Sequence, residues 1–203
     1  MWLDRGCAGR ETGGRCRTGR DVPADEGGAM AQRPLMVRTQ TSVTLRASPE
    51  VVYDTIADLQ AHLEWSGERA SDDNFRLLSL DAPEGPAKVG TTFTSSGTAD
   101  NGTFHDRSVV TEASRPGRFI IETDSRLDRK RGKVWEAHFS HRYDIEPEGD
   151  GSRISYTETV ERVNYVPYWL QPWIRPIFTI MVNRADMRQL SNLARLAEER
   201  SGL

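Results

Sequence analysis

Side chains of two kinds alternate over residues 37–45: one parity holds Val37, Thr39, Thr41, Val43 and Leu45, and the other holds the more polar Arg38, Gln40, Ser42 and Thr44. Because side chains of a strand point alternately to its two faces, this period of two predicts a half-buried strand. The tripeptide Ser48-Pro49-Glu50 follows, and it combines an N-cap residue, a proline suited to the first helical turn and an early carboxylate. We therefore expect a helix to begin here. Its core-facing residues would be Val51, Val52, Ile56 and Leu59.

Residues 75–80 suggest a further short strand, and residues 91–163 show the pattern of successive antiparallel hairpins. Alternating runs are separated there by short groups of turn-forming residues. Asn101-Gly102 is the pair preferred in a two-residue type I′ turn. The other predicted turns lie at 115–117, 128–132 and 147–151.

Each turn position predicts which residues pair across its hairpin. Followed from turn to turn, the pairs keep one set of side chains on the same face of five strands. A slip of one residue at any turn would reverse that agreement, because the period of a strand is two. The predicted pairs are Phe93 with Val110, Val110 with Ile121, Ile121 with Phe139, Phe119 with His141, Tyr143 with Tyr156, and His141 with Glu158.

The hydrophobic spacing changes to three and four residues after Pro167, which predicts a long C-terminal helix. Pro172 and Pro176 make a regular helix unfavourable before about Trp173. A run of strands followed by this helix indicates the α+β class. The expected apolar face of the helix comprises Ile177, Ile180, Met181, Met187, Leu190, Ala194 and Ala197.

The N-terminal segment, residues 1–34, differs in composition from the rest of the chain. It is rich in glycine and arginine and has no apolar period, so we expect a disordered extension before one folded domain over 35–203. We hypothesise that Met30 is the natural start. Cys7 and Cys16 lie in this extension without histidines nearby, and we interpret them as incidental thiols rather than a metal site.

Charge and motifs exclude several classes of function. The formal net charge of the 203 residues is −3, which argues against a general nucleic-acid binder. No apolar run reaches the ~20 residues of a membrane span, and none has the form of an export signal, so we expect a cytoplasmic protein. The chain lacks a glycine-rich phosphate loop, a Cys/His metal set and a serine-nucleophile elbow, so no metal or cofactor is expected.

Local motifs resemble those of a known superfamily over about residues 36–200. They are Ala47–Asp54 with Asp58 and Glu64-Trp65, then Val89-Gly90-Thr91, then Arg115–Phe119. On these residues the chain resembles the START-like, or SRPBCC, superfamily, in its polyketide cyclase/dehydrase branch, which includes coenzyme Q-binding proteins. The resemblance implies a helix-grip fold, with a curved antiparallel sheet of about seven strands wrapped on the long C-terminal helix around an apolar cavity. The superfamily contains binders, carriers, cyclases and hydrolases, so the fold does not select an activity.

Strand parity together with this resemblance predicts the residues that line the cavity. Aromatic residues on an inward strand face also suit a filled core, and that alternative stays open. Trp65 and Trp173 would lie at the rim. The expected ligand-binding residues are Phe93, Phe104, Asp106, Val110, Phe119, Ile121, Trp135, Phe139, His141, Tyr143, Tyr156, Glu158, Ile177 and Met181.

Polar side chains on the same face are the candidates for chemistry. His141 would face Glu158 across the last hairpin, next to Phe119 and near Glu112. The pair is open to three interpretations: a cross-strand ion pair reached by water, a contact to a polar group of the ligand, or a general base with its orienting partner. A second polar group on this face comprises Ser95, Asp106, Ser108, Thr123 and Ser125.

Two surface segments suggest contacts outside the cavity. The aromatic stretch 165–174, with Tyr168, Trp169 and Trp173, suits either weak contact with a membrane surface or a lid packed on its own domain. The basic hairpin tip between Arg126 and Lys133 is typical of a solvated turn and could also meet an anionic partner.

The sequence thus predicts a protein that binds one small, largely apolar molecule, such as a lipid, a polyketide or an isoprenoid-like compound. The alternative is a cyclase or dehydratase acting on a polyketide-like substrate, with His141 and Glu158 as its catalytic candidates. A further alternative is an interaction protein that docks a partner through the basic tip or the aromatic stretch.

Overall fold

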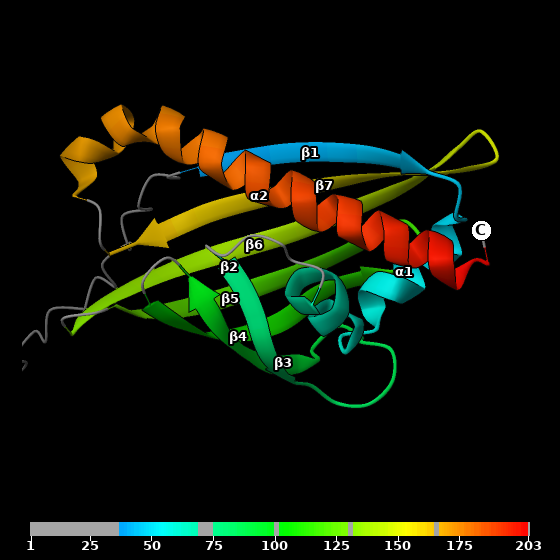
Figure 1. Ribbon diagram of the computed structural model, residues 1–203, viewed down its shortest axis with the longest axis horizontal. Coiled ribbons are helices and arrows are strands. Elements are labelled where there is room, and N and C mark those ends of the chain that lie inside the picture. Colours follow the sequence, from blue (N-terminus) through cyan, green and yellow to red (C-terminus); the bar gives the residue numbers. More distant parts are fainter. Residues whose placement is uncertain (1–36, 69–74, 100–101, 130–131, 165–166, 203) are drawn as a thin grey trace, which may run out of the picture. The chain divides into compact units, whose positions relative to one another are not determined.

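Seven strands of the described chain pair into one antiparallel sheet, and a long helix lies across one of its faces (Figure 1). The structure is a computed structural model and describes residues 37–68, 75–99, 102–129, 132–164 and 167–202. The elements in chain order are β1 (Val37–Leu45), α1 (Pro49–Ala57), the π-helical turn η1 (Leu63–Glu68), β2 (Phe75–Asp81), β3 (Thr92–Ala99), β4 (Gly102–Ser114), β5 (Arg118–Arg129), β6 (Lys133–Glu148), β7 (Gly151–Val163), the short turn η2 (Tyr168–Leu170) and α2 (Gln171–Arg200).

The sheet has the order β1-β7-β6-β5-β4-β3-β2, so the first strand pairs with the last. The remaining strands follow one another as hairpins. This arrangement confirms the α+β class, the expected seven strands and the helix-grip fold. The expected N-terminal extension, with Cys7, Cys16 and Met30, lies outside the described residues and stays a prediction.

Two of the predicted hairpin registers are confirmed, and two are shifted by two residues. Val110 pairs with Ile121, and His141 pairs with Glu158, as expected. Between β3 and β4, however, Phe93 pairs with Ser108, and between β5 and β6, Ile121 pairs with His141. A shift of two keeps every side chain on its original face, so the predicted inward face of the sheet survives both errors.

The first register error comes from the turn. Ala99 pairs with Gly102, so residues 100–101 connect β3 to β4 and Gly102 already belongs to β4. A side chain at Gly102 would lie only 2.7 Å from the carbonyl oxygen of Asp128 on β5. Glycine is therefore required at this position because β4 and β5 approach each other closely. The Asn-Gly dipeptide in the sequence does not indicate this role.

The predicted pairing of Phe119 with His141 is also wrong, because Phe119 pairs with Tyr143. The expected nearness of Glu112 to His141 fails for a related reason. A β-bulge between Val110 and Glu112 changes the register of β4, and Glu112 lies beside Arg118 with 3.7 Å between Oε1 and Nη1.

The first helix begins where the sequence predicts, at Pro49. Ser48 occupies the N-cap position, but its side chain makes no capping hydrogen bond. A different contact holds the helix to the sheet. Arg115 donates two hydrogen bonds to the carboxylate of Asp54, at 2.8 and 2.9 Å.

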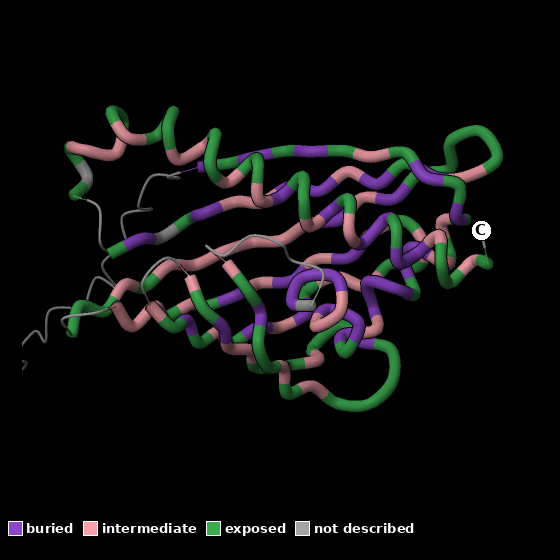
Figure 2. Tube along the Cα trace, in the orientation of Figure 1, coloured by how far each residue is buried: buried purple, intermediate pink, exposed green. Residues whose placement is uncertain are grey.

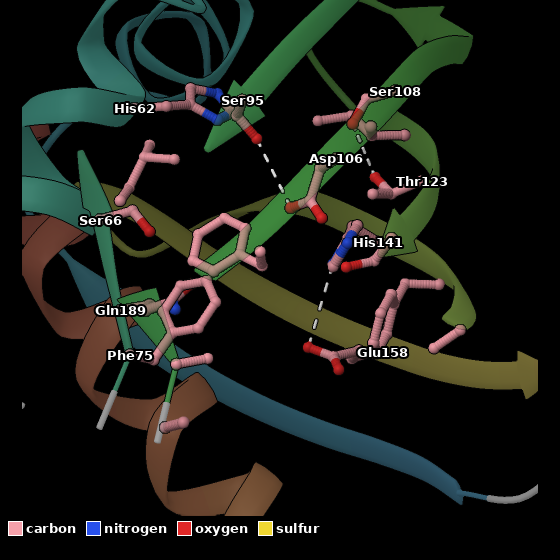
Figure 3. Close-up of a pocket in the computed structure, with 18 of the residues that line it drawn as sticks. His62, Ser66, Phe75, Ser95, Asp106, Ser108, Thr123, His141, Glu158 and Gln189 are labelled. Atoms are coloured by element: carbon pink, nitrogen blue, oxygen red, sulfur yellow. Dashed lines mark hydrogen bonds and ion pairs between the residues drawn. The ribbon is translucent and has the colours of Figure 1, made fainter. Parts of the chain in front are cut away.

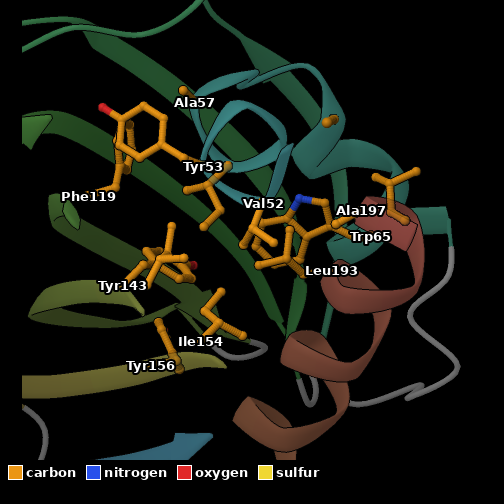
Figure 4. Close-up of a cluster of buried hydrophobic side chains, with 14 of the residues drawn as sticks. Val52, Tyr53, Ala57, Trp65, Phe119, Tyr143, Ile154, Tyr156, Leu193 and Ala197 are labelled. Carbon is orange, nitrogen blue, oxygen red and sulfur yellow. The ribbon is translucent and has the colours of Figure 1, made fainter. Parts of the chain in front are cut away.

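The main core lies where α1 and the C-terminal half of α2 cover one end of the sheet (Figure 4). Val52 and Ile56 of α1 are fully buried there, and so is Leu193 of α2. Phe119 of β5 is also fully buried, with its ring edge-on to Tyr53 at 5.8 Å between centroids. This end of the inward face is thus filled with side chains.

The long helix is buried along its C-terminal half and exposed along much of its N-terminal half (Figure 2). Leu190, Ala194 and Ala197 are buried as predicted. The rest of the predicted apolar face is exposed: Ile177 by 65%, Ile180 by 56%, Met181 by 60% and Met187 by 40%.

The reason is that the N-terminal half of α2 packs on a different stripe. Ile174 and Phe178 contact a small cluster formed by Val37, Val160 and Val163 at the other end of the sheet. Residues spaced by four share one face of a helix. Because the face with Ile174 and Phe178 packs on the sheet, the predicted face with Ile177 and Met181 points outward.

The helix also starts earlier than expected, at Gln171. Pro172 lies in its first turn, where the missing N–H loses no intrahelical bond. The lid interpretation of the aromatic stretch is wrong for Trp169 and Trp173, which are 72% and 79% exposed. Weak membrane contact through Tyr168, Trp169 and Trp173 stays a prediction. None of the helices in the described part of the chain is long and apolar enough to span a membrane.

Candidate ligand-binding cavity

A cavity of about 370 Å³ lies beside the filled core, between the sheet, η1 and α2 (Figure 3). Most of its wall is apolar, and much of that wall comes from the predicted inward face of the sheet. The predicted residues that line it are Phe93, Phe104, Asp106, Ile121, Trp135, Phe139, His141, Tyr143, Tyr156 and Glu158.

Four predicted lining residues lie elsewhere. Val110 and Phe119 have the expected parity but are fully buried in the core, because α1 covers their end of the sheet. Ile177 and Met181 are exposed on the outer side of α2. Trp173, expected at the rim, is exposed and does not line the cavity, whereas Trp65 is buried in its wall.

The sequence-based reasoning missed the part of the wall that closes over the sheet. The four-residue spacing of Phe178, Val182 and Asp186 on α2 was a usable signal for it. No comparable signal indicated that η1 and β2 fold against the same space. The missed lining residues are His62, Ser66, Phe75, Leu77, Leu80, Ala99, Leu127, Glu136, Ala137, Phe178, Val182, Ala185, Asp186 and Gln189.

Asp106 of β4 is a polar centre within the cavity wall (Figure 3). It accepts a hydrogen bond of 3.5 Å from Ser95, and the hydroxyl of Ser125 also acts on it. Burial raises the pKa of this carboxyl to about 6. Its Oδ1 atom is buried and has no hydrogen-bond partner among the described residues. Ser108 and Thr123 bond each other at 2.9 Å and so satisfy themselves.

A second polar network joins four elements, β6, β7, α2 and β1. The hydroxyl of Tyr156 donates to Oε2 of Glu158 at 3.0 Å and lies 2.7 Å from Nδ1 of His141. Glu158 is hydrogen-bonded to Asp186 of α2. Asp186 in turn accepts a bond of 2.6 Å from Thr39 of β1. The network therefore runs from the middle of the sheet to the covering helix.

The charge states of this network differ from those of a salt bridge. Burial, followed by the nearby charge of Asp186, raises the pKa of Glu158 well above its ordinary value. Burial raises the pKa of Asp186 to about 6 and lowers that of His141 to about 4. The lowered pKa keeps His141 uncharged at neutral pH and the raised pKa of Glu158 disfavours its charged form, so the 3.9 Å contact between Nδ1 and Oε2 is weak as an ion pair and the Tyr156 hydroxyl bridges the two side chains. These pKa shifts argue against the ion-pair interpretation of His141 and Glu158.

His62, which directly precedes η1, is another acceptor at the wall. Its Nε2 lies 2.9 Å from the carbonyl oxygen of Ile56, and because a carbonyl only accepts, Nε2 carries the proton. The ring packs against Trp65, with 4.7 Å between centroids. Burial lowers the pKa of His62, which keeps the ring neutral and its Nδ1 a hydrogen-bond acceptor.

Within the ranges that the structure describes, no three His, Cys, Asp or Glu side chains are grouped to hold an ion.

Comparisons with known proteins identify the fold and a family. The family model described as "Polyketide cyclase / dehydrase and lipid transport" matches residues 36–198. No curated protein matches the chain.

Solved structures resemble this one at low sequence identity. A protein from Thermus thermophilus has a TM-score of 0.54 and 14% identity, over 81% of this chain and 99% of its own. An uncharacterised protein from Rhizobium leguminosarum has a TM-score of 0.52 and 15% identity, over 80% and 99%. A protein from Chromobacterium violaceum has a TM-score of 0.52 and 16% identity, over 79% and 97%. Likeness at such identity supports the fold alone.

Proposed function

Because the chain belongs to the polyketide cyclase / dehydrase and lipid transport family, we propose that it binds one small, largely apolar molecule in the cavity between sheet and helix. The observation that carries the proposal is the cavity of about 370 Å³ with a wall of aromatic and aliphatic side chains. Ligand sites of this kind are concave and mostly apolar, with a few convergent polar groups. A lipid, a polyketide or an isoprenoid-like compound has this character.

The position of the polar groups supports binding rather than simple packing. A filled core would leave no space beside Asp106 and His141. Burying polar side chains that lack hydrogen-bond partners costs free energy. Here both border the cavity, where the polar group of a ligand can meet them. Apolar contact would supply affinity, and these side chains would orient the ligand.

Filling the cavity tests the proposal. Val182 of α2 lines the cavity, and Val182→Trp should place an indole in the space that a ligand needs. The probe is Nile red, an uncharged apolar dye whose fluorescence reports the polarity of its surroundings. We expect its affinity, measured by fluorescence titration, to fall at least about tenfold in this variant.

The matched control is Asn183→Trp, at the next residue of the same helix, whose side chain is exposed. It should leave the dye affinity unchanged. Native mass spectrometry of the protein from its own host, before and after denaturation, would identify a bound molecule directly. Equal dye binding by both tryptophan variants and the unmodified chain would contradict binding in this cavity.

A second candidate function is favoured by one specific contact. Since the Tyr156 hydroxyl donates to Glu158, Nδ1 of His141 must carry the proton in the 2.7 Å contact between His141 and Tyr156, which leaves Nε2 unprotonated and able to accept a proton. A neutral imidazole oriented by a hydroxyl and a carboxyl can remove a proton next to a carbonyl group. That step occurs in the cyclisation or dehydration of a polyketide-like substrate.

The catalytic candidate is tested by hydrogen exchange at carbon. In D₂O the protein should accelerate α-proton exchange of 2-tetralone, followed by NMR, and His141→Ala should lower the rate by about 100-fold without loss of 2-tetralone binding. The control is His138→Ala, on the outer face of β6, where the ring bonds Asp124 and Glu122. An unmodified protein that exchanges 2-tetralone no faster than buffer would leave His141 with an orienting role only.

A further inference from the structure

The polar groups of the cavity have an unusual balance of charge. Carboxyl groups reach its wall from β4, β7 and α2, as Asp106, Glu158 and Asp186. Among the described lining residues there is no lysine or arginine. The two histidines of the wall are neutral at physiological pH, because burial lowers the pKa of each. No positive charge of the described wall therefore offsets the carboxyl groups.

The surroundings of Asp106 provide hydrogen bonds but not a counter-charge. From β3 and β5 it meets the hydroxyls of Ser95 and Ser125. The basic residue that acts on it is His105, its neighbour along β4, whose side chain points to the other face of the sheet and is 56% exposed. One carboxyl oxygen of Asp106 has no partner among the described side chains. The carboxyl group of Asp106 can therefore accept one more hydrogen bond.

Asp186, on α2, also lacks a counter-charge. The groups that face it are the hydroxyl of Thr39 on β1 and the carboxyl of Glu158 on β7, and neither carries positive charge. Two acidic centres thus border one largely apolar space, Asp106 from the sheet and Asp186 from α2. A buried carboxylate without a cationic partner is costly, and a ligand that supplies the partner regains that free energy on binding.

We propose that the cavity selects apolar molecules whose polar group donates hydrogen bonds and carries no negative charge, above all a protonated amine, and that it rejects apolar carboxylates. This inference rests on the proposed binding function and specifies its ligand class. An amine head group would donate to Asp106 or to the Asp186–Glu158 pair while its carbon skeleton contacts the aromatic wall. A carboxylate would meet like charge and find no lysine or arginine to pair with.

The test compares three probes that share one carbon skeleton: 1-naphthylmethylamine, 1-naphthylmethanol and 1-naphthylacetic acid. We expect calorimetric titration near neutral pH to give the order amine, alcohol, carboxylate, with at least about a tenfold difference between the first and the last. Asp106→Asn should bring the affinity for the amine close to that for the alcohol. The matched control, Asp124→Asn, alters a 73% exposed carboxylate on the outer face of the neighbouring strand and should leave the order unchanged.

The pH dependence of amine binding has a defined sign. Burial raises the pKa values of Asp106 and Asp186 to about 6, so both become charged as the pH rises through that value. Affinity for the amine, which stays protonated, should therefore increase from below to above this pH, while affinity for the alcohol changes little.

The possible outcomes distinguish the selection by charge from the proposed binding function on which it rests. If the carboxylate binds as tightly as the amine, the selection by charge is overturned while apolar binding stands. If the preference for the amine persists in Asp106→Asn and in Asp186→Asn, the carboxyl groups are not its source and the inference fails. If none of the three probes binds although the protein is folded, both the inference and the proposed function are overturned.

Discussion

Replacing Phe119 by alanine is expected to lower the free energy of unfolding by about 3–5 kcal/mol, the usual cost of removing a buried phenylalanine. Its ring is fully buried and packs edge-on against Tyr53, where α1 meets the sheet. The ring lies in the filled core rather than at the cavity, so neighbouring side chains must either collapse or leave a void. Chemical denaturation followed by circular dichroism measures the loss.

The companion variant is Phe139→Ala, at a position of the same parity that lines the cavity. The ring of Phe139 is only partly buried, so its removal should cost less than half as much and instead weaken the binding of apolar probes. The pair distinguishes filled core from cavity wall on one face of the sheet. Equal destabilisation by the two substitutions would contradict the division that the structure shows.

Replacing Asp186 by asparagine is expected to change how stability depends on pH. Burial raises the pKa of Asp186 from its ordinary value of 3.8 to about 6 in the folded chain. Between these values the folded chain keeps a proton that the unfolded chain has released, so the free energy of unfolding falls as the pH rises. Asparagine has no proton to lose. Relative to the unmodified protein, Asp186→Asn should therefore gain about 2–3 kcal/mol between about pH 4 and about pH 8.

Denaturation at several pH values measures this difference. The lowered pKa of His141 acts in the opposite direction, since the stability it brings is lost as the pH falls below its unfolded value. That contribution is present in both chains, so the comparison largely cancels it. Asp150→Asn, in the exposed turn between β6 and β7, serves as the control and should follow the unmodified chain. A constant difference in stability between Asp186→Asn and the unmodified chain at all pH values would show that folding does not raise the pKa of Asp186.

Much of the cavity wall was predictable because the orientation of a strand side chain depends only on its parity. Phe93, Tyr156 and Glu158 were placed correctly on the inward face, although the pairings of β3 with β4 and of β5 with β6 were wrong by two residues. An even shift in register leaves the face unchanged. The pairing of His141 with Glu158 was predicted correctly because the turn at residues 147–151 sets the register of β6 and β7, and both residues lie only a few positions from it in the sequence.

The helical side of the site was harder to predict. The spacing of Ile177 and Met181 is helical, but it does not identify which stripe of α2 meets the sheet. The partner of Glu158 is Asp186, and although the spacing from Phe178 and Val182 places Asp186 on one face of α2, nothing in the sequence pairs it with Glu158. Contacts between segments far apart in the chain decided both.

The sequence by itself determined the strands, the two helices, the inward face of the sheet and, through its motifs, the resemblance to the family. These features follow from local periodicity and from short stretches of chain, which act over a few residues. Only the tertiary structure decided which part of that face is filled by α1, as at Phe119, and which part stays open beside His141 and Asp106. The physical reason is that an element's position over a sheet is set by packing between distant segments, and the same packing creates the burial that shifts the pKa values of the carboxyl groups.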